Sequence, residues 1–500
     1  MKKAIKKLMA ALLAVAMLCA MAVPAFAAEV TNSNVSITNH DFEAYQIFAG
    51  KYEDGKLTNI VWGDGVDADK LLTALKTNSL YSACKDAADV AKVLENNNND
   101  AVAQEFANVV AENLSDVKTS GKGSVALPAA GYYLIKDVTT VEGKDDALNK
   151  TLLKVDGAET VTPKVKTDKP TVEKKVKDTN DTTGTTTGWQ DSADYDIGDT
   201  IPYQLTATMG DLSNYNTYSI EFVDTMTHLT FSGIKYVKVG DKELVAGEYT
   251  YNWNEESKIL TVSIADVKAL GAVKGTKVVV EYEATLDADA AIGAAGNPNE
   301  VYLKYSNNPN GSGEGKTAPD KNIVFTYKVN ANKVDQDGNA LMGAAFELFK
   351  KVGGDWVSKG VQNATYDANT GKYTLIENST ATTFEWSGLD DGTYKLVEVV
   401  TPTGYNSIAD QIFEIKAEHD VESDDPKLTN LTGDAETGST ITFTPGVSNG
   451  ELSTEIENRM GSTLPETGGI GTTIFYVVGG GLMVAAAILL ITKKRMEKDN

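Results

Sequence analysis

Cysteine and histidine are scarce in this chain, which has two cysteines and three histidines among 500 residues. Cys19 lies in an apolar run near the N-terminus, so Cys84 is the only cysteine in the remaining sequence. One thiol cannot form an intramolecular disulfide. The histidines are scattered singly, at His40, His228 and His419. No zinc-ligand spacing or hydrolase triad is apparent, so we expect no metal and no cofactor.

Positive charge is also in short supply, because 46 lysines and arginines face 70 aspartates and glutamates. The formal net charge of −24 repels nucleic acid, so we expect no nucleic-acid partner. Asp335-Gln336-Asp337-Gly338-Asn339 starts like a calcium loop. The twelfth position is Phe346 rather than glutamate, which excludes an EF-hand but leaves calcium binding elsewhere open.

The N-terminus has the pattern of a secretory signal peptide. Four lysines precede an apolar run from Leu8 to Val23, and Ala25-Phe26-Ala27 supplies the small residues of a cleavage site. We therefore expect residues 1–27 to be removed on export, with mature protein beginning near Ala28.

The C-terminus combines a short motif with an apolar run and a basic tail. The pentapeptide at residues 464–468 is followed by a Gly-rich spacer, the apolar run from Ile474 to Ile491, and a basic cluster at residues 493–495. About 18 uncharged apolar residues are just long enough to span a bilayer as a helix. The basic cluster keeps that end in the cytoplasm. The pentapeptide consists of Leu464, Pro465, Glu466, Thr467 and Gly468.

Between the two ends, the pattern indicates a mainly β chain of three tandem Ig-like sandwich domains. Pro-containing polar stretches at residues 162–170 and 307–321 separate the domains. The first domain has a helical middle, at Ala68 to Ser82 and Asp86 to Leu114, where apolar residues recur at three- and four-residue steps. The expected divisions are 28–167, 168–322, 323–460, and a sorting segment at 461–500.

Three polar residues of the second domain are expected to point into its core. Lys174 alternates in phase with Val172 and Val176, so it shares their buried face if the segment is a strand. By the same parity Asn299 is in phase with neighbouring apolar residues, and Asp224 is in phase with Phe222. Burying such groups is costly unless they pair or react. Lys175 and Asn307 remain alternatives to Lys174 and Asn299.

The third domain repeats this arrangement. Lys333 is in phase with two apolar residues of its first strand, Asn458 with Ile456 of its last strand, and Glu398 with Tyr394. Desolvation lowers the pKa of a lysine and raises that of a carboxylic acid. A neutral lysine can then attack the asparagine side chain, expelling ammonia. We therefore expect two Lys–Asn isopeptide bonds, assisted by Asp224 and Glu398.

Family resemblances follow from these motifs. The C-terminal arrangement resembles the cell-wall sorting signal of Gram-positive surface proteins, which implies cleavage by sortase between Thr467 and Gly468. Residues 332–348 resemble the opening of a collagen-adhesin B-type domain, and residues 394–405 resemble its E-box, whose glutamate assists isopeptide formation. The second domain is similar to the isopeptide-forming domain of Gram-positive major pilins.

Val161-Thr162-Pro163-Lys164 resembles the pilin motif, although threonine stands where that family usually has tyrosine. The resemblance implies that the Lys164 amine attacks the sortase acyl-enzyme and joins Thr467 of another subunit. Proline cannot donate a backbone hydrogen bond to a sheet, which favours an exposed lysine at this point. Lys166 and Lys169 lie close by and remain alternative acceptors.

Together these resemblances imply the shaft subunit of a covalent pilus on a Gram-positive cell wall, which supports adhesion and has no enzymatic turnover. The membrane would hold the precursor only transiently. Expected partners are a class C-type pilus sortase, a housekeeping sortase, further copies of the chain, minor pilins, peptidoglycan and host surface ligands. The alternative is a wall-anchored monomeric adhesin with the same domains, in which Lys164 has no role.

Overall fold

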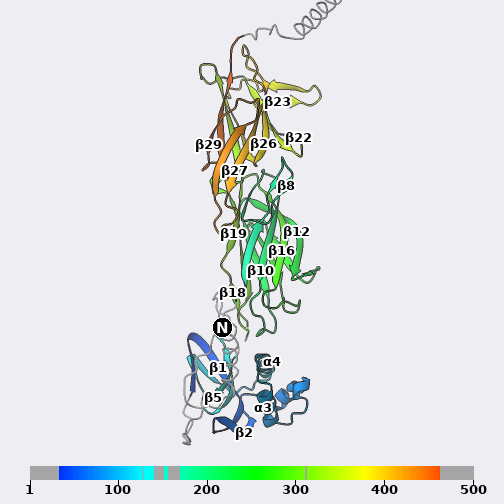
Figure 1. The fold of residues 1–500 in the computed structure, drawn as a ribbon, viewed down its shortest axis with the longest axis vertical. Coiled ribbons are helices and arrows are strands. Elements are labelled where there is room, and N and C mark those ends of the chain that lie inside the picture. Colours follow the sequence, from blue (N-terminus) through cyan, green and yellow to red (C-terminus); the bar gives the residue numbers. More distant parts are fainter. Residues whose placement is uncertain (1–32, 128, 140–150, 156–168, 310–311, 462–500) are drawn as a thin grey trace, which may run out of the picture.

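The computed structural model describes residues 33–127, 129–139, 151–155, 169–309 and 312–461. These residues form an elongated molecule in which three domains follow one another along the long axis (Figure 1). Strands dominate each domain, and the expectation of a mainly β chain with several sandwich domains is confirmed.

Several predictions from the sequence concern residues outside this described part. These are the signal peptide at 1–27, Lys164, the pentapeptide at 464–468 and the apolar run at 474–491. Among the residues that the structure does describe, no helix has both the length and the apolar character needed to cross a membrane.

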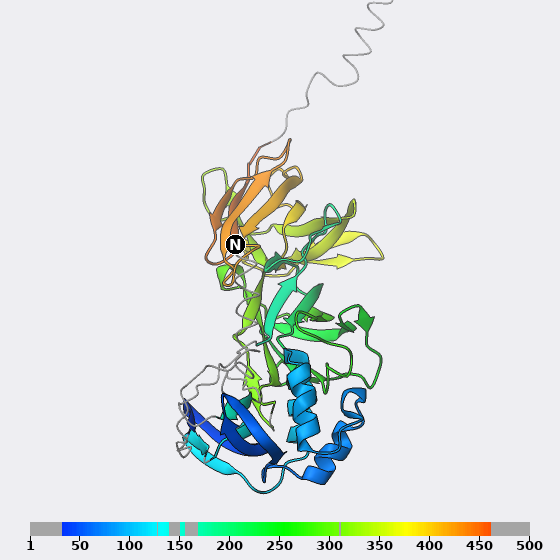
Figure 2. The same cartoon turned by 60° about the horizontal axis from the view of Figure 1, so that its bottom comes forward.

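The first domain is a five-stranded sheet with helices packed against one face (Figures 1 and 2). The strand order is β2-β1-β4-β5, and β3 pairs with the other part of the long, irregular β1. The elements are β1 (Ser33–Glu53), β2 (Lys56–Trp62), α2 (Ala68–Leu75), η1 (Ser79–Tyr81), α3 (Ala87–Asn96), α4 (Asp100–Ala111), β3 (Thr119–Leu127), β4 (Gly131–Asp137) and β5 (Thr151–Val155).

Side-chain caps set where these helices begin. The Asp67 carboxylate accepts from the Lys70 amide, and the Asp86 carboxylate accepts from the Asp89 amide. The expected second helical segment is divided in two by the run Asn97-Asn98-Asn99. The Asn99 side chain accepts from the amide of Val102 and so begins α4. Asparagine side chains compete for backbone hydrogen bonds, which explains why the helix does not continue through this run.

The second domain is a two-sheet sandwich. One sheet has the order β13-β12-β16-β10-β6, and the other has β14-β15-β11-β17-β19-β9 with β18 on β17. A small hairpin of β7 and β8 projects toward the third domain (Figure 1). The strands are β6 (Thr171–Val176), β7 (Thr179–Asn180), β8 (Thr185–Thr186), β9 (Ser192–Asp194), β10 (Thr200–Thr208), β11 (Ile220–Met226), β12 (Leu229–Val239), β13 (Lys242–Glu243), β14 (Thr250–Asn254), β15 (Ile259–Ile264), β16 (Lys277–Leu286), β17 (Asn297–Ser306), β18 (Glu314–Lys316) and β19 (Asp320–Phe325), with the short helix η2 (Gly293–Ala295).

The third domain is a second sandwich, with sheets β25-β20-β30-β29 and β22-β21-β26-β27-β28. Its first and last strands, β20 and β30, lie side by side and parallel. The strands are β20 (Tyr327–Asp335), β21 (Ala345–Val352), β22 (Asp355–Gln362), β23 (Ala364–Asp367), β24 (Lys372–Leu375), β25 (Thr383–Leu389), β26 (Gly392–Val400), β27 (Gln411–His419), β28 (Leu428–Ala435), β29 (Phe443–Gly446) and β30 (Glu451–Asn458).

The last strand of the second domain extends past the expected division at residues 322/323. β19 runs from Asp320 to Phe325 and pairs with β17 and β9, so all six of its residues belong to the second sandwich. Thr326 alone separates it from β20. A connection this short leaves little freedom between the two domains, which also share backbone hydrogen bonds such as Ile197 N–H to Gly388 O (3.0 Å).

Candidate functional site: two buried lysines

The structure brings Lys174, Asp224 and Asn299 together in the core of the second domain, and all three are fully buried. Lys174 comes from β6 in one sheet, while Asp224 on β11 and Asn299 on β17 come from the facing sheet. We call these residues the second-domain trio. The strand of Asn299 is not the last strand of this domain, because β19 follows it. A bond between Lys174 and Asn299 would therefore join the two sheets.

A tyrosine that sequence reasoning missed links the members of this trio. Lys174 Nζ lies 2.6 Å from Asp224 Oδ1 and 2.8 Å from the Tyr282 hydroxyl. Asn299 Nδ2 donates to the same hydroxyl at 2.8 Å, and the hydroxyl donates to Asp224 Oδ2. Lys174 and Asn299 thus share one hydrogen-bonding partner. Asn299 Oδ1 is buried and makes no hydrogen bond of normal geometry with the described residues.

Burial determines the protonation of this pair. Desolvation lowers the pKa of Lys174, although the Asp224 charge offsets part of that effect. Desolvation likewise raises the pKa of Asp224, and its contacts with Lys174 and Tyr282 oppose the rise. The aromatic rings of Tyr203 and Tyr282 stack on each other and exclude water beside the Lys174 amine. Both shifts favour a neutral amine beside a neutral acid.

The alternatives Lys175 and Asn307 occupy different surroundings. Lys175 is partly exposed and pairs with Asp191 at 2.7 Å. Asn307 is buried, but it follows the end of β17. Asp224 is opposite Val301, two residues from Asn299 and six from Asn307 along the strand. Asn307 is therefore about 20 Å from that position along the strand direction. These positions and contacts favour Lys174 and Asn299 over Lys175 and Asn307 as the residues that form the bond in the second domain.

The third-domain trio consists of Lys333, Glu398 and Asn458. Lys333 on β20 and Asn458 on β30 are almost completely buried on neighbouring strands of one sheet. Lys333 is opposite Ile456, so Asn458 is its diagonal neighbour two residues farther along, on the same face. Glu398 reaches this point from β26 in the facing sheet.

Hydrogen bonds orient the third-domain trio. Asn458 Nδ2 donates to Glu398 Oε1 at 2.8 Å, while Asn458 Oδ1 is buried without a hydrogen bond among the described residues. The Lys333 amine donates to the backbone oxygens of Ile456 (2.7 Å) and Val334 (3.0 Å). Desolvation lowers the pKa of Lys333 to about 8, and desolvation raises the pKa of Glu398.

A third buried lysine, missed by sequence reasoning, lies where the second and third domains meet. Lys350 lies 2.9 Å from each of three carboxylates, those of Asp181, Asp196 and Asp390. These charges raise the pKa of Lys350 despite its burial. A lysine held charged in this way is a poor nucleophile, so Lys350 acts as a structural ion-pair centre.

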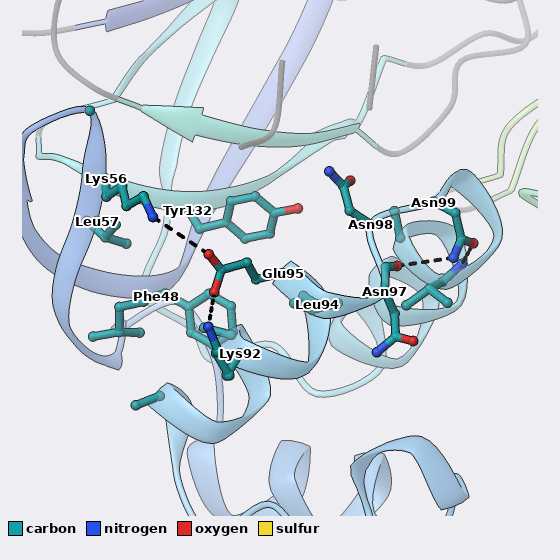
Figure 3. A pocket seen from close by; sticks show the side chains of 16 residues that line it. Phe48, Lys56, Leu57, Lys92, Leu94, Glu95, Asn97, Asn98, Asn99 and Tyr132 are labelled. Carbon is teal, nitrogen blue, oxygen red and sulfur yellow. Dashed lines mark hydrogen bonds and ion pairs between the residues drawn. The ribbon is translucent and has the colours of Figure 1, made fainter. Parts of the chain in front are cut away.

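The first domain contains a surface pocket of another kind (Figure 3). Its apolar lining includes Phe48, Leu57 and Tyr132, and Glu95 pairs at the rim with Lys92 (2.6 Å) and Lys56 (3.9 Å). The pocket lies between α3, α4 and the sheet. No buried nucleophile or cluster of convergent charges accompanies it in the described residues, and it carries no catalytic assignment.

Comparisons with known proteins agree with this architecture. Residues 327–429 match the SpaA family model, a prealbumin-like fold domain, and residues 458–500 match the LPXTG cell wall anchor motif. The trypsin-resistant surface T6 protein of Streptococcus pyogenes is 24% identical over 221 residues, which cover 41% of this chain and 35% of the T6 protein. The chain thus spans about a third of the length of that curated relative.

Solved pilin structures resemble the chain over most of its length. The T6 backbone pilin of Streptococcus pyogenes is 16% identical with a TM-score of 0.48, and the match covers 87% of this chain and 100% of the pilin. The major pilin SpaD of Corynebacterium diphtheriae is 16% identical with a TM-score of 0.43, covering 88% and 100%. The sequence matches to the family models and to the T6 protein show that the chain contains a prealbumin-like SpaA domain, has the LPXTG anchor of Gram-positive cell-wall proteins, and is homologous to the streptococcal T6 protein.

Proposed function

We propose that this chain is the shaft subunit of a covalently polymerised pilus, stabilised by isopeptide bonds from Lys174 to Asn299 and from Lys333 to Asn458. The observation that carries this proposal is the pair of buried trios. Each sandwich domain buries one lysine, one asparagine and one carboxylic acid of its trio together, and the side-chain oxygen of each asparagine is buried without a hydrogen bond among the described residues. Uncompensated polar burial of this kind is costly in a protein that has no reaction to perform.

The reaction balances within each trio. A neutral lysine Nζ attacks the asparagine Cγ, a new Nζ–Cγ bond forms, and the Cγ–Nδ2 bond breaks to release ammonia. The neutral acid, Asp224 or Glu398, donates a proton to the asparagine oxygen as negative charge develops there. The resulting carboxylate takes a proton from the attacking Nζ and passes it to the departing nitrogen, and it recovers its own proton from the oxygen as the carbonyl re-forms and ammonia leaves. Each acid is regenerated, but lysine and asparagine are consumed, so the chain completes this step once and is not an enzyme with turnover.

Each bond would stabilise its domain chiefly by restricting the unfolded chain. The closed loop includes nearly the whole domain in both cases. By the chain-entropy estimate used for disulfides, a loop of this length contributes about 4–5 kcal/mol. Reducing agents do not cleave an amide. The described residues contain one cysteine, Cys84, which is buried and free, so they have no disulfide. Isopeptide bonds would supply the covalent crosslinks that a long extracellular fibre needs.

Subunits would be joined by sortase. The sortase cysteine cleaves after Thr467 and holds this residue as an acyl-enzyme, which the Lys164 amine of another copy resolves. Each transfer forms one Lys–Thr amide and regenerates the thiol. The last subunit is passed to peptidoglycan instead, which leaves the fibre fixed to the wall.

The size distribution of wall-released protein tests this proposal. Denaturing gels of wall extracts should show a series of high-molecular-weight bands that persists after boiling and reduction, because amide bonds join the subunits. A single band at the size of one chain would contradict polymerisation and favour the monomeric adhesin. Extracts from cells without the pilus sortase provide the control and should show that single size.

A further inference from the structure

The junction between the second and third domains contains carboxylates that form no ion pair with a lysine or arginine of the described residues. Asp178 follows β6, and Asp194 ends β9, both in the second domain. His419 ends β27 of the third domain and brings its ring between them. Lys350 and Lys359 neutralise neighbouring aspartates but form no ion pair with Asp178 or Asp194 among the described residues.

The hydrogen bonds of Ser192 determine how the His419 ring is protonated. Ser192 Oγ lies 2.6 Å from the backbone oxygen of Asp420 and 2.7 Å from His419 Nδ1. A hydroxyl has a single proton, and a carbonyl oxygen can only accept, so the proton of Ser192 goes to Asp420. His419 Nδ1 must therefore carry a proton and donate it to Ser192. In the neutral ring, Nε2 then has a free lone pair.

This nitrogen faces two carboxylate oxygens. His419 Nε2 is 3.7 Å from Asp178 Oδ2 and 3.7 Å from Asp194 Oδ1, which is beyond hydrogen-bond distance. All three ligand atoms lie within 4.8 Å of one another. The other oxygen, Asp194 Oδ2, is buried and makes no hydrogen bond of normal geometry with the described residues. Lone pairs of three groups therefore converge on a point where no lysine or arginine of the described residues forms an ion pair.

We propose that Asp178, Asp194 and His419 bind a divalent transition-metal ion, of which Zn²⁺ is the representative. Imidazole nitrogen with two carboxylates suits zinc and its neighbours, whereas Ca²⁺ and Mg²⁺ prefer oxygen ligands alone. Zinc ligands lie about 2.0–2.2 Å from the ion, so two of them can be separated by up to about 4 Å, in keeping with the observed 3.7 Å. Three protein ligands leave one tetrahedral position for water.

Two further contacts of His419 hold its ring in place. Its second nitrogen is held by Ser192, and the Phe325 ring packs against it at 5.8 Å between centroids. Such outer contacts fix the tautomer and orientation of metal-binding histidines. Because the ligands come from two domains, the ion would fasten the third domain to the second. This clamp is separate from the isopeptide bonds, which lie within single domains.

Zinc titration of the purified, tag-free and chelator-treated chain tests this site. Calorimetry should show one Zn²⁺ bound per chain, and excess Ca²⁺ or Mg²⁺ should not displace it. Asp194→Asn and His419→Ala should abolish binding. Ser192→Ala should weaken it roughly 10–100-fold, since this residue only positions the ring. The matched control is His228→Ala, because His228 pairs with a single exposed carboxylate, that of Asp289, and its loss should leave binding unchanged.

X-ray absorption at the zinc edge supplies a second readout that is independent of how well the variants fold. The wild-type spectrum should contain one imidazole and otherwise oxygen ligands. A sulfur ligand would place the ion at Cys84 and overturn the proposal. Absence of binding by the wild-type chain, or unchanged binding by folded His419→Ala, would equally overturn it. Absence of binding by the wild-type chain would indicate that protons alone balance the charge of Asp178 and Asp194 at the junction.

Discussion

Replacing Glu398 with alanine is expected to lower the unfolding temperature of the third domain by about 12–20 °C, because the Lys333–Asn458 bond then fails to form. The estimate combines the ~4–5 kcal/mol contributed by closing the loop with a shift of about 3–4 °C per kcal/mol for a domain of this size. Differential scanning calorimetry of the exported chain would resolve this transition. The intact mass should also lie about 17 Da above that expected for the Glu398→Ala chain with both bonds formed, because the ammonia is retained.

Two further variants separate the lost bond from lost packing. Glu398 also accepts from Thr401 and the Ile408 amide, so its removal disturbs more than the reaction. Asn458→Ala removes the reacting carbon but leaves those contacts, and it should destabilise the domain similarly. Glu347 is a buried glutamate of the facing sheet that bonds to Ser358, and Glu347→Ala should leave the crosslink intact. A Glu398→Ala protein that still forms the bond would refute the assigned role.

Replacing Lys164 with alanine is expected to abolish the series of high-molecular-weight bands without changing folding or either internal bond. The acceptor amine is lost, while Thr467 can still form the acyl-enzyme and be transferred to peptidoglycan. Denaturing gels of wall extracts, with intact mass as the check on the internal bonds, measure both outcomes.

Neighbouring lysines provide matched controls for this experiment. Lys166→Ala and Lys169→Ala remove the same charge from the same stretch and should polymerise normally. Thr467→Ala should instead block cleavage, so that the precursor stays at the membrane. If polymer persists in Lys164→Ala but disappears in one of the other lysine variants, the acceptor is misassigned although the shaft proposal stands. If polymer persists in all three, the monomeric adhesin becomes the better account.

The alternation of side chains along a strand explains how much of the two buried trios could be predicted. Lys174 alternates with Val176 and Lys333 with Ala331, and these apolar neighbours can only face a core, so each lysine must be buried with them. Parity does not say which strands are neighbours. Lys174 and Asn299 lie in facing sheets, whereas Lys333 and Asn458 lie on adjacent parallel strands. Only the fold reveals this difference.

Contacts between distant segments lay beyond sequence reasoning. Tyr282 is one of many alternating aromatic residues, and nothing local distinguishes it as the link between Lys174 and Asn299. His419 is more than 200 residues from Asp178 and Asp194, so the expectation that no metal would bind considered local spacing only. These groups meet at the domain junction, where Thr326 is the sole residue between β19 and β20.

The intact mass of the folded wild-type chain, residues 28–467, tests the central claim most directly. Two isopeptide bonds release two molecules of ammonia, so the mass should be about 34 Da below that of the sequence. Tryptic mapping should recover crosslinked peptides joining Lys174 to Asn299 and Lys333 to Asn458. An unmodified mass in fully folded protein would contradict the account, as would crosslinks that involve other residues.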